Sequence, residues 1–131
     1  MPDKIGDKVQ SANWKKEKHV PVIECEDKIN ADEWAAVKVS VGKDIAHPNT
    51  TEHHIVWIQA YFVPDGGKFA YDLGRFQFNA HGASGEGPNT GPVWTHHMAK
   101  FKFKTNKPGT LNAVSYCNIH GLWESSKKIA I

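Results

Sequence analysis

Apolar and polar residues alternate with a period of two in several short stretches of the chain. Side chains in such a stretch point alternately to two faces, so one face can pack on a core while the other meets water. Residues 55–63 form a longer stretch that is apolar on both faces, which indicates a more buried strand. The strands predicted in this way span residues 20–23, 37–41, 55–63, 76–79, 99–104, 111–116 and 127–131.

Turn-forming sequences separate these stretches, notably PDGG at 64–67, GEGPN at 85–89 and NKPG at 106–109. About seven short strands with regular turns predict an all-β protein built as an antiparallel β-sandwich. Residues 30–36 are enough for one helical turn but too few to change this fold class. Residues 82–91 are rich in Gly, Pro, Ser and Asn, and they are expected to form one long surface loop.

The length of 131 residues, without repeat or linker, predicts a single domain over residues 1–131 with an N-terminal arm at 1–12, where periodicity is absent. No apolar run approaches the roughly 20 residues needed to span a bilayer. The polar N-terminus has no signal-peptide core. A net charge of +2 and the absence of a long Lys/Arg block argue against nucleic-acid binding. We therefore expect a soluble, cytoplasmic protein that binds neither membrane nor nucleic acid.

The chain has two cysteines, Cys25 and Cys117, which are too few for a disulfide framework. A disulfide between them is one alternative, but a cytoplasmic compartment and the metal-ligand setting of Cys117 disfavour it. Cys25 alternates with charged neighbours in residues 23–26, and we expect it to be a buried strand residue.

Side chains that bind transition metals fall in three clusters near predicted strand ends, at residues 17–21, 47–53 and 117–121. Their donors are His19, His47, His53, Cys117 and His120. Cys117 and His120 lie three residues apart just after a strand, where a tight loop lets both bind one ion. A single cluster of this kind more often has a structural role than a functional one. Three such clusters in a chain with eight histidines favour one shared metal site. Five donors exceed the four at which a structural zinc site closes, so they favour a redox-active metal with one open position.

Four histidines remain after this assignment. His54 directly follows His53, and successive residues of an extended segment face opposite sides, so only one of the pair should reach the metal. The others lie near turns without a carboxylate or thiol at ligand spacing, and we expect surface or hydrogen-bonding roles for them. These are His81, His96 and His97.

The segments that carry the five donors resemble the three signatures of the superoxide reductases. These segments are EKHVP at 17–21, HPNTTEHHI at 47–55 and SYCNIHGLW at 115–123, and AHGAS at 80–84 also fits. The chain resembles the one-iron, neelaredoxin-type branch of this desulfoferrodoxin family, because no cysteine precedes Cys25 to form the four-cysteine domain of the two-iron branch. The resemblance extends from about residue 13 to the C-terminus, and it implies an immunoglobulin-like β-sandwich.

The resemblance also implies a cofactor, a reaction and partners. The cofactor is a mononuclear iron (Fe2+/Fe3+) with Cys117 as axial ligand and four equatorial imidazoles, from His19, His47, His53 and His120. The reaction is the one-electron reduction of superoxide to hydrogen peroxide with uptake of two protons. The electrons come from an external donor such as rubredoxin, and the family suggests a homotetramer.

Two further residues receive roles from the resemblance. Glu17 corresponds to a carboxylate that occupies the sixth position when the iron is oxidised. Lys18 is a movable cation near the open face, where it can attract the superoxide anion. The backbone N–H groups of Asn118 and Ile119 are expected to donate hydrogen bonds to the Cys117 sulfur.

Two other interpretations stay open. A blue-copper electron carrier also combines a β-sandwich with two His, one Cys and a weak axial Met, but no Met follows Cys117 and the extra histidines would be unexplained. A metal-free immunoglobulin-like binding module predicts that removing the histidines changes only surface charge. The patch around His120, Leu122 and Trp123 is a candidate docking face for the donor, although Trp123 is equally expected in the core.

Overall fold

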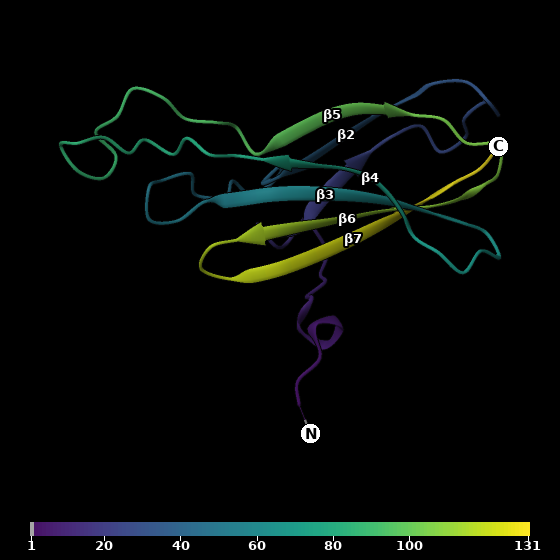
Figure 1. Ribbon diagram of the computed structural model, residues 1–131, viewed down its shortest axis with the longest axis horizontal. Coiled ribbons are helices and arrows are strands. Elements are labelled where there is room, and N and C mark those ends of the chain that lie inside the picture. The colour runs from purple at the N-terminus through teal and green to yellow at the C-terminus, as the bar shows by residue number, and fades with distance from the viewer. Residues whose placement is uncertain (1) are drawn as a thin grey trace.

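The computed structural model describes residues 2–131, and over this range it contains seven strands and one short 3-10 helix, η1 (Ile5–Lys8). The strands are β1 (Pro21–Glu24), β2 (Ala35–Val41), β3 (Ile55–Pro64), β4 (Tyr71–Gln77), β5 (Met98–Phe103), β6 (Gly109–Cys117) and β7 (Gly121–Ile129). They form two sheets, with strand orders β1-β2-β5 and β4-β3-β6-β7, and all of their pairings are antiparallel. The predicted antiparallel sandwich of about seven strands is confirmed (Figure 1).

The core lies between the two sheets and is built from the alternation seen in the sequence. On β2 the inward residues Val37, Val39 and Val41 are buried, and on β6 every second residue from Gly109 to Cys117 is buried. β3 carries apolar residues on both faces, as predicted. Its outward Trp57 stacks on Tyr116 of β6, with 5.7 Å between the ring centroids.

Two edge strands have other bounds than predicted. β4 covers Tyr71–Gln77 rather than 76–79, and β7 covers Gly121–Ile129 rather than 127–131. Each is an edge strand with many exposed positions, so its outward residues are polar and the apolar alternation is weak. Both strands are held by backbone pairing with an inner neighbour, which hydropathy does not report. The expected helical turn at 30–36 is wrong: the chain makes a non-helical turn there, with Asp32 at a positive φ of 60°.

The N-terminal segment leaves the body of the molecule, as Figure 1 shows. Residues 2–8 are exposed, and the chain joins the sandwich at Gln10, which pairs with the edge strand β7 beside Trp123. Gln10 N–H donates to Leu122 O at 2.9 Å, and Glu124 N–H donates to Gln10 O at 2.8 Å. Of the predicted arm at 1–12, Met1 lies outside the described residues. Within residues 2–131, no helix has the length and apolarity that crossing a bilayer requires.

The segment between β4 and β5 lies at the same end of the sandwich as the end of β6 and the starts of β3 and β7 (Figure 1). It is largely irregular, as predicted for 82–91, and short bridges join His81 to Trp94 and Ser84 to Gly87. Gly82 has a φ of +74°, and a Cβ there would lie 2.4 Å from the Trp94 ring. Only glycine fits at position 82, where it allows the chain to pass close to the Trp94 ring.

Candidate metal centre

Antiparallel pairing brings the three donor clusters to one end of the sandwich. Ile55 at the start of β3 pairs with Cys117 at the end of β6, which places the 47–53 segment beside the 117–120 loop. The segment before β1 is fixed by buried Ser115 of β6, whose hydroxyl donates to His19 O at 3.1 Å. Residues about 100 positions apart in the chain therefore meet at this end.

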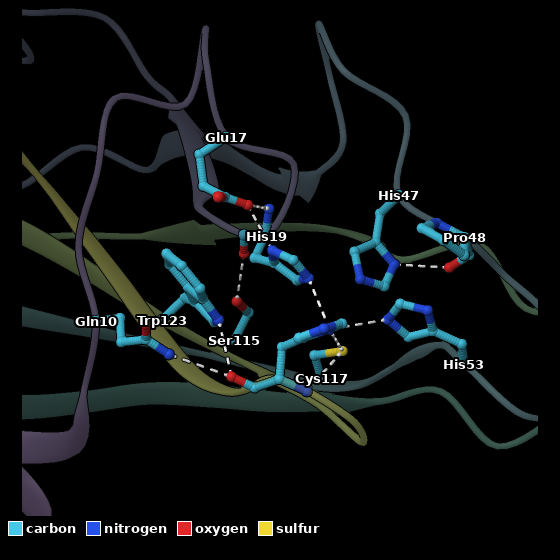
Figure 2. A network of polar contacts seen from close by, with 10 residues as sticks. Gln10, Glu17, His19, His47, Pro48, His53, Ser115, Cys117 and Trp123 are labelled. Atoms are coloured by element: carbon cyan, nitrogen blue, oxygen red, sulfur yellow. Dashed lines mark hydrogen bonds and ion pairs between the residues drawn. The ribbon is translucent and has the colours of Figure 1, made fainter.

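Four of the five predicted donors form one compact group: His19, His53, Cys117 and His120. One ligand atom from each lies within 4.8 Å of the others (Figure 2). His120 Nδ1 lies 3.1 Å from His19 Nε2, 3.3 Å from His53 Nε2 and 3.8 Å from the Cys117 sulfur. Bonds of about 2.0–2.1 Å from one ion to neighbouring imidazoles give nitrogen separations of about 3 Å. The spacing of these side chains therefore suits a single transition-metal ion.

The fifth predicted donor, His47, lies beside this group. Its ring centroid is 5.0 Å from that of His19 and 4.9 Å from that of His53. Its Nδ1–H donates to Pro48 O at 2.6 Å, while its Nε2 is buried without a hydrogen-bond partner. A buried acceptor without a partner costs about 1–3 kcal/mol, so such an atom needs an explanation. The free lone pair of Nε2 is explained if His47 is a further ligand of an ion bound by the neighbouring donor group.

The protonation of His47 also suits a ligand. Burial is the main reason that its pKa is lowered from 6.5 to about 4, and His19, His53 and His97 lower it further. The pKa of His53 is lowered as well, first by burial and then by the charges of His120, His19 and Lys18. Neutral imidazoles can bind a metal ion near pH 7 without first losing a proton.

The thiol of Cys117 lies on the core side of the group and is fully buried. Its sulfur accepts a hydrogen bond from His120 N–H at 3.4 Å. The expectation for Asn118 is wrong, because Asn118 N–H instead donates to His54 O at 3.2 Å. The turn after β6 directs this N–H toward the neighbouring segment and not toward the sulfur.

Both cysteines are free, so the alternative of a disulfide between Cys25 and Cys117 is wrong. Cys25 is half-buried and follows the last residue of β1, and the prediction of a buried strand residue is therefore wrong too. Acidic neighbours Glu26 and Asp27 are exposed and end the strand. Burial raises the pKa of the Cys25 thiol.

Glu17 forms hydrogen bonds with His19. Its carboxylate accepts hydrogen bonds from His19 N–H at 2.9 Å and from His19 Nδ1–H (Figure 2). Burial raises the pKa of Glu17, but these hydrogen bonds outweigh burial and leave it below its usual value. A carboxylate on one ring nitrogen fixes the tautomer and leaves the other nitrogen free to bind a metal.

The comparison with known proteins assigns a family. The desulfoferrodoxin family profile matches residues 11–126. The chain belongs to the desulfoferrodoxin family. It is 59% identical over 128 residues to Neelaredoxin of Megalodesulfovibrio gigas, and the alignment covers 98% of each chain. It is 56% identical over 121 residues to Superoxide reductase of Pyrococcus furiosus, covering 92% of this chain and 95% of the relative. The solved Superoxide reductase (Neelaredoxin) from Archaeoglobus fulgidus superposes with a TM-score of 0.87 at 56% identity, over 95% of this chain and 99% of that one.

Trp123 contacts two of the predicted donors in a way that sequence patterns did not reveal. Its half-buried ring stacks on His19, with centroids 5.0 Å apart and planes at 14°, and its Nε1–H donates to His120 O at 3.2 Å. Gln10 Nε2–H donates to the same carbonyl at 3.3 Å. Trp123 is thus a wall of the site and not a residue of the main core. Its place in the 115–123 motif was the available signal.

The other histidines surround the site without joining the donor group. His54 stacks on His81 with ring centroids 3.5 Å apart. His81 Nε2–H donates a hydrogen bond to Phe78 O at 2.7 Å, which confirms the predicted hydrogen-bonding role of His81. His96 is exposed, as predicted. The surface alternative is wrong for His97, which is buried and meets His47 edge-on at 5.9 Å. Burial is the main reason that the pKa of His97 is lowered to about 4.

One cleft lies at the other end of the sandwich, away from the donor group. Its volume is about 660 Å³, and it is lined by the turn at 64–69 and by residues 103–107. It shares no residue with the donor group. This cleft is therefore not part of the candidate metal site.

Proposed function

We propose that this protein is a superoxide reductase, which binds one iron ion and reduces superoxide to hydrogen peroxide. Its ligands are His19, His47, His53, Cys117 and His120. The observation that carries the proposal is the compact group of four donor atoms together with the buried, unpartnered Nε2 of His47. Relatives named Neelaredoxin and Superoxide reductase, at 59% and 56% identity, support it.

The donor set fits iron better than copper or structural zinc. Bound iron supplies the one-electron chemistry by cycling between Fe2+ and Fe3+. A blue-copper site uses two His and one Cys with a weak axial ligand, so it would leave two of the four predicted histidine donors unexplained. Five donors also exceed the four that close a structural zinc site.

The surroundings of the donors direct an anion to one side of the site. The Cys117 sulfur lies on the core side, whereas His120 is exposed and His53 is half-buried. Solvent therefore reaches the group from the side away from the sulfur. Lys18 lies near enough to His53 for its charge to lower the pKa of that ring. We assign Lys18 the role of attracting superoxide to this side.

Glu17 is proposed to act in two arrangements. In the structure described above it fixes the orientation of His19. Its proposed second arrangement, as a ligand of oxidised iron, requires the carboxylate to leave both hydrogen bonds to His19. The short 17–20 segment before β1 would then have to move, which is a gating motion of the kind that loops beside active sites perform.

The remaining expectations from the sequence and from the resemblance stay predictions. They are an external electron donor similar to rubredoxin, a homotetramer, a single domain and a cytoplasmic location. The exposed surface beside His120 is the proposed docking face for the electron donor, because His120 is the exposed member of the donor group.

The proposed function is tested by metal binding and superoxide reactivity of the purified chain. Reconstitution with Fe2+ should give one iron per chain, a thiolate charge-transfer band on oxidation and rapid removal of superoxide in pulse radiolysis. Cys117→Ser should abolish the band and the reaction. Cys25→Ser is the matched control, since Cys25 lies outside the donor group, and it should retain both. Preference for copper, or indifference of all readouts to the histidines, would refute the proposal.

A further inference from the structure

Asn118 binds the backbone on both sides of His53. Its Oδ1 accepts a hydrogen bond from His54 N–H at 2.9 Å, and its Nδ2–H donates to Glu52 O at 2.9 Å. Asn118 N–H also donates to His54 O at 3.2 Å. Three hydrogen bonds thus join the loop that carries Cys117 and His120 to the peptide groups that flank His53.

Asn89 binds the same segment from the outer loop at 82–91. Its Oδ1 accepts a hydrogen bond from Thr51 N–H at 2.9 Å, and its Nδ2–H donates to the Glu52 carboxylate at 2.9 and 3.1 Å. Asn89 N–H donates to Thr51 Oγ1 at 3.0 Å. Asn89 has a φ of 59°, a left-handed conformation that is uncommon for non-glycine residues but that Asn adopts more readily than most.

The His53 segment needs such support because no strand contains it. β3 begins at Ile55, so residues 47–54 lack the ladder of hydrogen bonds that fixes a strand. Metal ligands must be held within about 0.5 Å of their working positions by their surroundings. Loss of a hydrogen bond behind a metal ligand typically costs 10–100-fold in metal affinity.

We propose that Asn118 and Asn89 are positioning residues of the metal centre, which hold the His53 segment between the 117–120 loop and the 82–91 loop. Asn118 ties one ligand segment directly to another, so that three of the ligands move as one unit. Through Asn89 the 82–91 loop helps to position the His53 segment, a role that the proposed reaction alone does not assign to this loop. The inference deepens the proposed function, but it requires only that the donors bind a metal.

The test compares Asn118→Ala and Asn89→Gly with the control Asn112→Ala. Asn112 lies on β6, and its side chain bonds only Thr110 O, at 3.3 Å. Glycine at position 89 allows the left-handed backbone and removes the side-chain hydrogen bonds. Asn118 and Asn89 are exposed, so their replacement leaves no buried cavity and the variants should fold.

The readout is anaerobic release of Fe2+ to a chromogenic chelator, with no superoxide present. We expect about tenfold faster release from each of the two variants, at the lower end of the usual range because both side chains are exposed. Their combination should be less than additive, because both hold one segment. The visible bands of Co2+-loaded protein should shift in Asn118→Ala, and unfolding of the metal-free variants should match that of the control.

Release rates within twofold of the control in both variants, with unchanged Co2+ spectra, would overturn the positioning role. Faster release matched by an equal loss of metal-free stability would also overturn it, since that pattern indicates general destabilisation. Because superoxide is absent, the result is independent of the reaction. A wild-type chain that holds Fe2+ but does not remove superoxide would refute the proposed function alone.

Discussion

Acid should destabilise the metal-free protein because two buried histidines must remain neutral in the folded state. The pKa values of His47 and His97 are both lowered from 6.5 to about 4, mainly by burial. The unfolded chain takes up these protons near pH 6.5, whereas the folded chain does so only near pH 4. Since the unfolded state binds more protons between these values, folding stability is fully present above about pH 6.5 and is lost as the pH falls toward 4.

The size of this effect follows from the difference between 6.5 and about 4. Each pKa unit corresponds to about 1.4 kcal/mol, so one histidine accounts for about 3 kcal/mol at the acid limit and about 2 kcal/mol at pH 5. The two rings lie 5.9 Å apart, so their contributions do not simply add. A loss of this size matters for a domain whose unfolding free energy is typically about 5–15 kcal/mol.

The assay is urea unfolding of the metal-free protein at pH 7 and pH 5, at one fixed protein concentration. His97→Leu removes one of the two titrating rings, and it should reduce the loss of stability between these pH values by about 2 kcal/mol. His96→Gln is the control, because the His96 ring is exposed. This variant should show most of the wild-type loss of stability between pH 7 and pH 5. An undiminished loss in His97→Leu, or a native His97 signal that titrates near pH 6.5 by NMR, would refute the reasoning.

Three further predictions concern single residues. Lys18→Ala should slow the reaction with superoxide and weaken its salt dependence, because a nearby cation attracts the anion; unchanged pulse-radiolysis rates and salt slope would remove Lys18 from the mechanism. Glu17→Ala should shift the oxidised visible band and ease azide binding, with little change in the first bimolecular step; an unaltered band with a much slower reaction would contradict its proposed ligand role. Gly82→Ala should destabilise the protein by about 1–3 kcal/mol, because the added methyl overlaps Trp94, whereas a loss below about 0.5 kcal/mol in denaturant unfolding would mean that the loop can shift.

Local patterns predicted the fold class and the donor residues. Alternation of apolar residues identified the inner strands β2, β3 and β6. These strands are buried on one or both faces, and their buried positions carry apolar residues. The edge strands β4 and β7 were placed poorly, since backbone pairing with one neighbour holds them and leaves much of their length exposed. The candidate donors could be named from the sequence because each cluster is a short motif whose residue types suit one metal ion.

Only the tertiary structure decided how the donors are held. The hydrogen bond from His54 N–H to Asn118 spans 64 positions, and the stack of Trp123 on His19 spans more than 100. The contact between His97 and His47, which keeps two buried rings together, joins two separate loops. Residue type and spacing act over a few neighbours in the chain. Contacts between distant segments depend instead on the packing of two sheets, which brings loop ends together at one end of the sandwich.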